Sequence, residues 1–142
     1  MQRSLALIGL GTGVLLGVAG LASPPKNGAK LAPIDFVRDI RPLLSQNCIP
    51  CHGSDDKKRQ AGLRLDTREG AMGKLPSGHF AVVSKKPAQS ALLQRLTAPA
   101  ALRMPPVASG KKLSAQEIAL LQRWVAEGAN FANHWAFQKP VR

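Results

Sequence analysis

The chain has 142 residues and a formal net charge of +12 at pH 7, which comes from 20 basic and 8 acidic residues. This length suffices for one compact domain and excludes a second full one. The positive charge would suit nucleic acid, an anionic membrane or an acidic protein, but the sequence has no helix-turn-helix, zinc-finger or RNA-binding motif, and its basic residues are scattered. We therefore expect no nucleic-acid partner.

The N-terminal segment has the layout of an export signal. Residues 1–22 carry the positive charge of Arg3 near their start, continue through an apolar run and end in small residues. This order predicts a cleaved signal peptide. An uncleaved membrane anchor is the alternative, although the apolar run is short for a bilayer and is interrupted by glycines. Both interpretations place the domain in the periplasm or cell envelope, with membrane contact only if the leader is uncleaved.

The folded domain is expected to span residues 34–137. It is preceded by a flexible linker over residues 23–33, rich in Pro, Gly, Lys and Ala, and followed by a short tail over residues 138–142. The recurrent apolar spacing within the domain predicts a mostly α fold.

The first helix is predicted after Asp35, whose side chain can cap a helix N-terminus. The apolar residues that follow recur at three- and four-residue spacing, which is typical of one buried helical face. Pro42 leaves two alternatives open: it kinks this helix, or it lies in the first turn of a shorter helix that begins there. The apolar residues are Phe36, Val37, Ile40, Leu43 and Leu44.

The middle of the chain is predicted to be mainly loop. Residues 53–84 are punctuated by Gly and Pro, and the apolar stretches at 63–65 and 80–83 are long enough only for two short extended pieces. A loop of this length in a compact domain needs a reason, and a buried prosthetic group that it wraps is one. Pro87 is then well placed for the first turn of a short helix that ends before Pro99.

The last helix has the clearest signal. Ser114 and Glu117 have the spacing of a capping box, and Gly128 is well placed to terminate the helix. Its apolar stripe predicts a buried face, and we expect Trp124 beside that stripe to pack against Phe36 of the first helix. The stripe consists of Ile118, Leu121 and Val125.

Cys48, Cys51 and His52 form a C-x-x-C-H motif, the attachment signature of c-type haem. Two thiols at this spacing can add to the two vinyl groups at one edge of a porphyrin, and the adjacent His can then ligate the iron. The alternatives are a thioredoxin-like redox pair, a zinc site and a plain disulfide. The first would be expected in a strand-helix pattern that the sequence lacks, and the second would need a fourth ligand from His79 or His134. The motif therefore predicts one covalent haem c.

Met104 is the leading prediction for a second axial iron ligand. It lies in the proline-stiffened segment 103–106 before the last helix, where a rigid backbone can hold a weak ligand, and a Met sulfur opposite His raises the reduction potential. Core packing is the alternative role for Met104. Met72 is the lesser rival, and His79 or His134 would give bis-histidine ligation instead, although we expect both at the surface or beside the site.

The basic residues have two further interpretations. Arg64, Arg68 and Arg103 could neutralise haem propionates, but nothing distinguishes them from solvated arginines. The net charge favours an acidic surface on a redox protein partner. The sequence gives no indication of an oligomeric state.

Several segments together carry a resemblance to a known family. They are FVRDIRP at 36–42, CIPCHG at 48–53, GLRLDTR at 62–68, RMPP at 103–106, IALLQRW at 118–124 and HWAF at 134–137. The sequence resembles the planctomycete-type cytochrome c modules, which usually lie at the N-terminal end of large exported proteins. The haem motif is the generic part of this resemblance, and the third and last segments make it specific.

The resemblance implies a mostly helical, cytochrome c-like domain with long haem-wrapping loops. It further implies covalent attachment at Cys48 and Cys51 and axial ligation by His52 and Met104. Family members typically continue beyond the HWAF segment into large domains, whereas this chain ends at Arg142. Any catalytic domain would lie outside this chain, so the resemblance supplies no enzymatic activity for it, and we expect an electron carrier or haem-binding module rather than an enzyme.

Three hypotheses follow for the function. The leading one is an electron carrier that transfers one electron at a time, with two axial ligands keeping substrates away from the iron. The second is a haem-based sensory or docking module whose distal ligand is open or exchangeable. The third is an interaction domain without haem, held by a Cys48–Cys51 disulfide.

Overall fold

The computed structural model describes residues 32–132, which lie within one compact unit that begins at Ala32. No strand forms within this range, and one isolated antiparallel bridge joins Lys74 and Phe80. The prediction of a mostly α fold is therefore confirmed. The helices are α1 (Arg41–Asn47), α2 (Arg68–Met72), α3 (Ala91–Leu96) and α4 (Ala115–Ala126), with a π-helical turn η1 (Phe36–Ile40) and two 3-10 turns, η2 (Pro87–Gln89) and η3 (Val107–Ser109).

Several predicted segments lie outside the described residues. These are the leader (1–22), nearly all of the linker (23–33), His134 with the rest of the HWAF segment, and the tail (138–142). Within residues 32–132, no helix is both long enough and apolar enough to cross a membrane.

The first helical segment changes from π to α geometry at Arg41. Asp35 caps it as predicted, because its carboxylate accepts a hydrogen bond from the Arg38 amide at 2.8 Å. Pro42 lies in the first turn of α1, where a missing N–H removes no helical hydrogen bond, so the second of the two alternatives for Pro42 holds. The prediction that Val37 is buried was wrong: its side chain is 52% exposed. The i→i+5 bonding of the π turn shifts the register of Val37 relative to the buried residues of α1.

The prediction of a helix-free loop over residues 53–84 was wrong at α2. Thr67 caps this short helix by accepting a hydrogen bond from the Gly70 amide at 3.1 Å. The two predicted extended pieces form no strands, and most of their apolar side chains enter the core instead, whereas Phe80 is 42% exposed. The buried members are Leu63, Leu65, Ala81 and Val82.

The helix predicted after Pro87 is divided in two. Pro87 starts the 3-10 turn η2, and Ser90 then adopts an extended backbone before α3 begins. The Ser90 side chain is fully buried, and its hydroxyl accepts from the Val83 amide at 2.9 Å and donates to the Lys86 carbonyl at 3.0 Å. This buried hydroxyl compensates for the break in helical hydrogen bonding.

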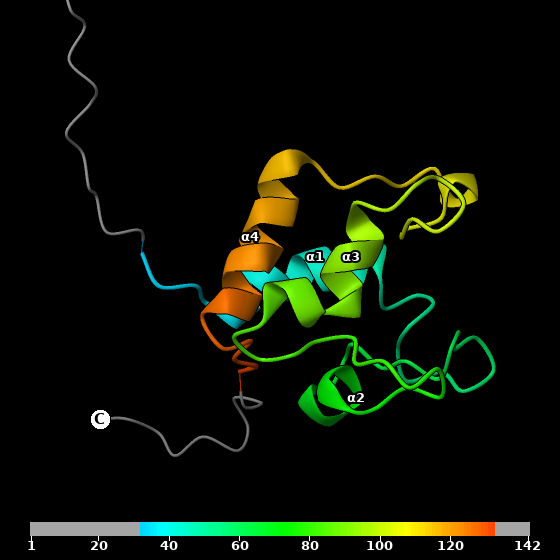
Figure 1. Cartoon of the computed structure of the whole chain (residues 1–142), viewed down its shortest axis with the longest axis horizontal. Coiled ribbons are helices and arrows are strands. Elements are labelled where there is room, and N and C mark those ends of the chain that lie inside the picture. Colours follow the sequence, from blue (N-terminus) through cyan, green and yellow to red (C-terminus); the bar gives the residue numbers. More distant parts are fainter. Residues whose placement is uncertain (1–31, 133–142) are drawn as a thin grey trace, which may run out of the picture. The chain divides into compact units, whose positions relative to one another are not determined.

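Helix α4 matches its prediction, and its buried residues pack in the core. The Ser114–Glu117 capping box is present, and Gly128 follows the helix with φ of +115°, a conformation that favours glycine. Trp124 is 2% exposed, and its ring centroid lies 6.0 Å from that of Phe36 and 5.2 Å from that of Phe131. This packing confirms that Trp124 joins the first and last helices. In Figure 1, α1, α3 and α4 form one group, while α2 lies in the loop region below it.

Candidate functional site

The C-x-x-C-H motif forms a tight turn at the C-terminal end of α1. Cys48 caps the helix, with its amide donating to the Leu44 carbonyl at 2.8 Å. The Cys48 carbonyl then accepts from the amides of Cys51 and His52, at 3.1 and 2.9 Å. These bonds fix the two thiols and the imidazole on one short stretch of ordered backbone.

The residues that follow the motif brace this turn. Gly53 is required by a close approach of the chain, because an added Cβ would lie 2.6 Å from the Ile49 carbonyl oxygen. Arg59 donates from Nε to the Gly53 carbonyl at 2.9 Å and from Nη2 to the Ser54 carbonyl at 3.0 Å, and it also pairs with Asp56. The guanidinium thereby ties the segment after the motif to the motif itself.

The imidazole of His52 is held in a defined tautomer. Its Nδ1 lies 3.2 Å from the Gln60 carbonyl oxygen, and because a carbonyl can only accept, Nδ1 must carry the proton. Burial lowers the pKa of His52, so the neutral ring is favoured and the lone pair resides on Nε2. An imidazole with Nδ1–H bonded to a carbonyl and a free Nε2 is the usual state of a metal-ligating histidine.

The two thiols have different surroundings. Cys48 is half-buried, whereas Cys51 is exposed, and both are free. Burial raises the pKa of Cys48 to about 11, with the Lys111 charge opposing the shift. Reactive cysteines in thioredoxin-like C-x-x-C sites have lowered pKa values. The opposite shift at Cys48 disfavours the thiol-exchange interpretation.

Met104 lies on the loop between α3 and α4, which the structure brings to the end of α1. The Met104 amide donates to the Arg95 carbonyl at 2.9 Å, and the Met104 side chain is 38% exposed. It lines a hollow of about 70 Å³ together with Lys111, whose ammonium donates to the Gln46 carbonyl, two residues before Cys48. The hollow is smaller than the roughly 300–1,000 Å³ that is typical of ligand pockets.

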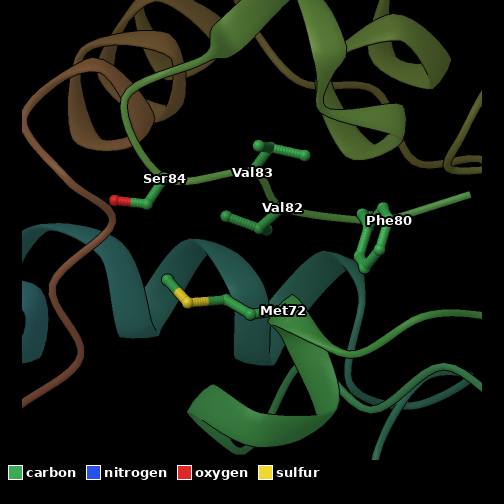
Figure 2. Close-up of a pocket in the computed structure, with 5 residues that line it drawn as sticks. All are labelled: Met72, Phe80, Val82, Val83 and Ser84. Carbon is green, nitrogen blue, oxygen red and sulfur yellow. The ribbon is translucent and has the colours of Figure 1, made fainter.

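Met72, the rival ligand, lies elsewhere. It is half-buried at the end of α2 and lines an open apolar groove of about 240 Å³. Figure 2 shows its side chain below the segment that crosses above it, facing Val82. The remaining lining residues are Phe80, Val83 and Ser84. Met72 and Met104 thus line different hollows, and the surroundings of Met72 are those of a packing residue.

The other residues that the sequence singled out are dispersed. His79 is exposed, and Arg64 forms an ion pair with Asp66 at 2.6 Å. Arg68 is exposed at the start of α2, whereas Arg103 lines the same hollow as Met104. The part of the chain that the structure describes contains no group of three or more His, Cys, Asp or Glu residues arranged to hold a metal ion.

Gln60, Arg59 and Lys111 were missed by sequence reasoning. Gln60 acts through its backbone carbonyl, which every residue has, so its side chain gives no signal. Arg59 and Lys111 were counted among scattered basic residues, because their carbonyl partners become neighbours only when the chain folds.

The described residues fit the donor set of a c-type haem. They provide two free thiols, an imidazole with a free Nε2 and a thioether on a loop that meets the motif-bearing helix. A family model described as Planctomycete cytochrome C matches residues 48–107, a range that begins at Cys48 and includes His52 and Met104. The resemblance seen in the sequence is therefore confirmed. Searches of curated proteins and of solved structures gave no match.

Proposed function

We propose that this chain, which belongs through residues 48–107 to the planctomycete cytochrome C family, binds one haem covalently and carries single electrons outside the cytoplasm. Membership of this family implies haem c as the cofactor and electron transfer as the type of function. Beyond this family-level function, we propose one haem, its covalent attachment, the residues that hold it and a location outside the cytoplasm.

The observation that carries the proposal is the orientation of His52. Its Nδ1–H is bonded to the Gln60 carbonyl, so Nε2 is free to act as the proximal iron ligand beside the two thiols. Cys48 and Cys51 would hold the cofactor by thioether bonds, and Met104 would supply the second axial ligand. Bound haem supplies the one-electron chemistry, and the chain orients and tunes it.

The proposed location rests on the sequence. Residues 1–22 have the order of charge, apolar run and small residues that directs export. The domain then acts in the periplasm or cell envelope, and it is tethered to the membrane only if this leader is retained.

A redox titration with carbon monoxide tests the carrier function. We expect the absorbance of the haem-loaded protein to follow a one-electron curve, and we expect no spectral change when carbon monoxide is added to the reduced form. The reason is that His52 and Met104 would fill both axial positions. Absence of a reversible one-electron step would contradict the carrier function.

One observation favours a second candidate function, a haem-based sensory or docking module. The Met104 side chain is 38% exposed on a loop that hydrogen bonds to Arg95 and from Lys111 tie to neighbouring segments. A loop held in this way could release its ligand to an incoming small molecule. Ready binding of carbon monoxide at neutral pH would support this module and exclude a permanent Met104 ligand.

A further inference from the structure

The distribution of charge along the chain is uneven. Residues 70–116 contain lysines and arginines but no aspartate or glutamate, whereas every acidic residue lies before or after this range. The ion pairs of the described domain also lie outside it, at Asp39, Asp55, Asp56, Asp66 and Glu127. The cations of this middle range therefore have no intramolecular acidic partner within residues 32–132.

Some of these cations gather around the loop between α3 and α4. Lys111 reaches the end of α1, Arg95 donates to the Leu102 carbonyl at 3.2 Å, and Arg103 lines the hollow beside Met104. Lys112 follows Lys111 and lines the same hollow. These contacts hold the basic side chains on or beside one loop, and three of them, Arg95, Lys111 and Lys112, are exposed.

The same loop exposes large apolar side chains. Leu102 is 53% exposed and Val107 is 55% exposed, on either side of Met104. A loop that exposes both apolar and charged side chains has the composition of a protein-protein interface, which combines an apolar centre with a polar rim.

We propose that Leu102 and Val107, together with Arg95, Arg103, Lys111 and Lys112, form a docking surface for an acidic protein, and we call it the α3–α4 loop surface. The inference rests on the proposed function, because the partner is taken to be the protein that exchanges electrons with this one. Its acidic groups would pair with the cations, and its apolar centre would cover Leu102 and Val107. Docking here places the partner against the loop that carries Met104.

A protein fits this surface better than an anionic membrane does. Surface binding to a membrane typically uses the free apolar face of an amphipathic helix. In the described domain the longest helix, α4, buries its apolar residues Leu121, Trp124 and Val125 in the core. The exposed apolar side chains Leu102 and Val107 lie on a loop rather than on such a helix face.

The test uses the haem-loaded full chain and reduced flavodoxin, an acidic one-electron donor protein, as the probe. The rate of electron transfer is measured at low salt for two variants, each with a matched control. Lys112→Glu is compared with Lys86→Glu, which makes the same change of net charge near the opposite end of α4. Val107→Ser is compared with Val37→Ser, because Val37 is similarly exposed, at 52%.

We expect Lys112→Glu to lower the second-order rate constant about fivefold, and Lys86→Glu to change it less than about twofold. Val107→Ser should lower the rate about threefold, with Val37→Ser near the wild type. The effect of Lys112→Glu should vanish at about 1 M salt, where the Debye length falls to about 3 Å.

Equal effects of the two charge variants, or no effect of Val107→Ser, would overturn the docking surface, since net charge alone would then explain the rates. Loss of binding to phosphatidylglycerol vesicles in Lys112→Glu, with unchanged flavodoxin rates, would identify a membrane partner instead. A chain that carries no haem would overturn the proposed function together with this inference. If the chain binds haem but Lys112→Glu and Val107→Ser transfer electrons at the wild-type rate, the docking surface alone would be overturned.

Discussion

His52 and Gly53 show how much of the site depends on backbone atoms. The His52 tautomer is fixed by the Gln60 carbonyl, and the turn that presents it closes at Gly53. We predict that Gly53→Ala destabilises the fold by about 1–3 kcal/mol, because a Cβ there would meet the Ile49 backbone oxygen at 2.6 Å and that oxygen cannot move freely.

Denaturant unfolding measures this cost, with Ser54→Ala as the control because Ser54 is exposed and adjacent. A Gly53→Ala protein as stable as the Ser54→Ala protein would show that the turn does not need the close approach.

The two methionines provide a second prediction at the residue scale. Met104→Ala should abolish the iron–sulfur absorption band of the oxidised protein and lower its reduction potential by more than about 0.1 V, because a Met ligand raises the potential. Met72→Ala should leave both readouts unchanged, since Met72 lines a different groove. The reverse pattern would assign the ligand to Met72.

Cys48, Cys51 and His52 could be proposed from sequence because their chemistry depends on spacing within one short segment. Met104 could be singled out only by its proline neighbours. The contacts of Arg59 and Lys111 could not be predicted, because each bonds to a backbone carbonyl of another segment and leaves no pattern in the sequence.

The start of α4 yields a prediction about pH. Hydrogen bonds from the Ser114 amide and hydroxyl lower the pKa of Glu117 from its ordinary value of 4.5. A lowered carboxyl pKa adds stability that is present above the ordinary pKa and is lost as the pH falls through the lowered value in the folded state.

We therefore expect Glu117→Gln to lower stability near pH 7 and to reduce the loss of stability as the pH falls below the ordinary value of 4.5. Urea unfolding at several pH values measures both effects. If Glu117→Gln and the wild type lose the same stability at low pH, the capping box contributes nothing to the pH dependence.

The tie between the Met104 loop and α1 is a second prediction at this scale. Lys111→Ala removes the ammonium that donates to the Gln46 carbonyl, so the loop should open more often. The Met104 amide should then exchange its hydrogen faster. A loss of about 1.4 kcal/mol of local stability corresponds to an exchange rate about tenfold higher. Lys112→Ala serves as the control. Equal exchange rates in the two variants would show that Lys111 does not hold the loop.

Elements with strong local signals were predicted, and those set by tertiary contacts were not. Helix α4 has a capping box and a regular stripe, and both appear in the structure. Helix α2 is only five residues long, too short for its periodicity to be recognised. The break at Ser90 was also unpredictable, because it depends on a buried hydroxyl that bonds to Val83, seven residues away.

At the scale of the whole molecule, one aromatic cluster links the core to the two ends of the described domain. Phe36, Trp124 and Phe131 contact one another from the first helical turn, from α4 and from the chain after it. The cluster closes the described domain by joining segments that are far apart in sequence. Sequence reasoning anticipated the pairing of Phe36 with Trp124, but it gave no role to Phe131, which follows the predicted end of the last helix.

The central claim is covalent attachment of one haem, and a denaturing gel tests it most directly. The full chain, residues 1–22 included, is expressed in a host that matures c-type cytochromes, then denatured and stained for haem, beside a Cys48→Ser, Cys51→Ser double variant. We predict one haem per chain that remains bound after denaturation and is absent from the double variant. A chain without haem, purified from a host that loads a control cytochrome, would contradict the account.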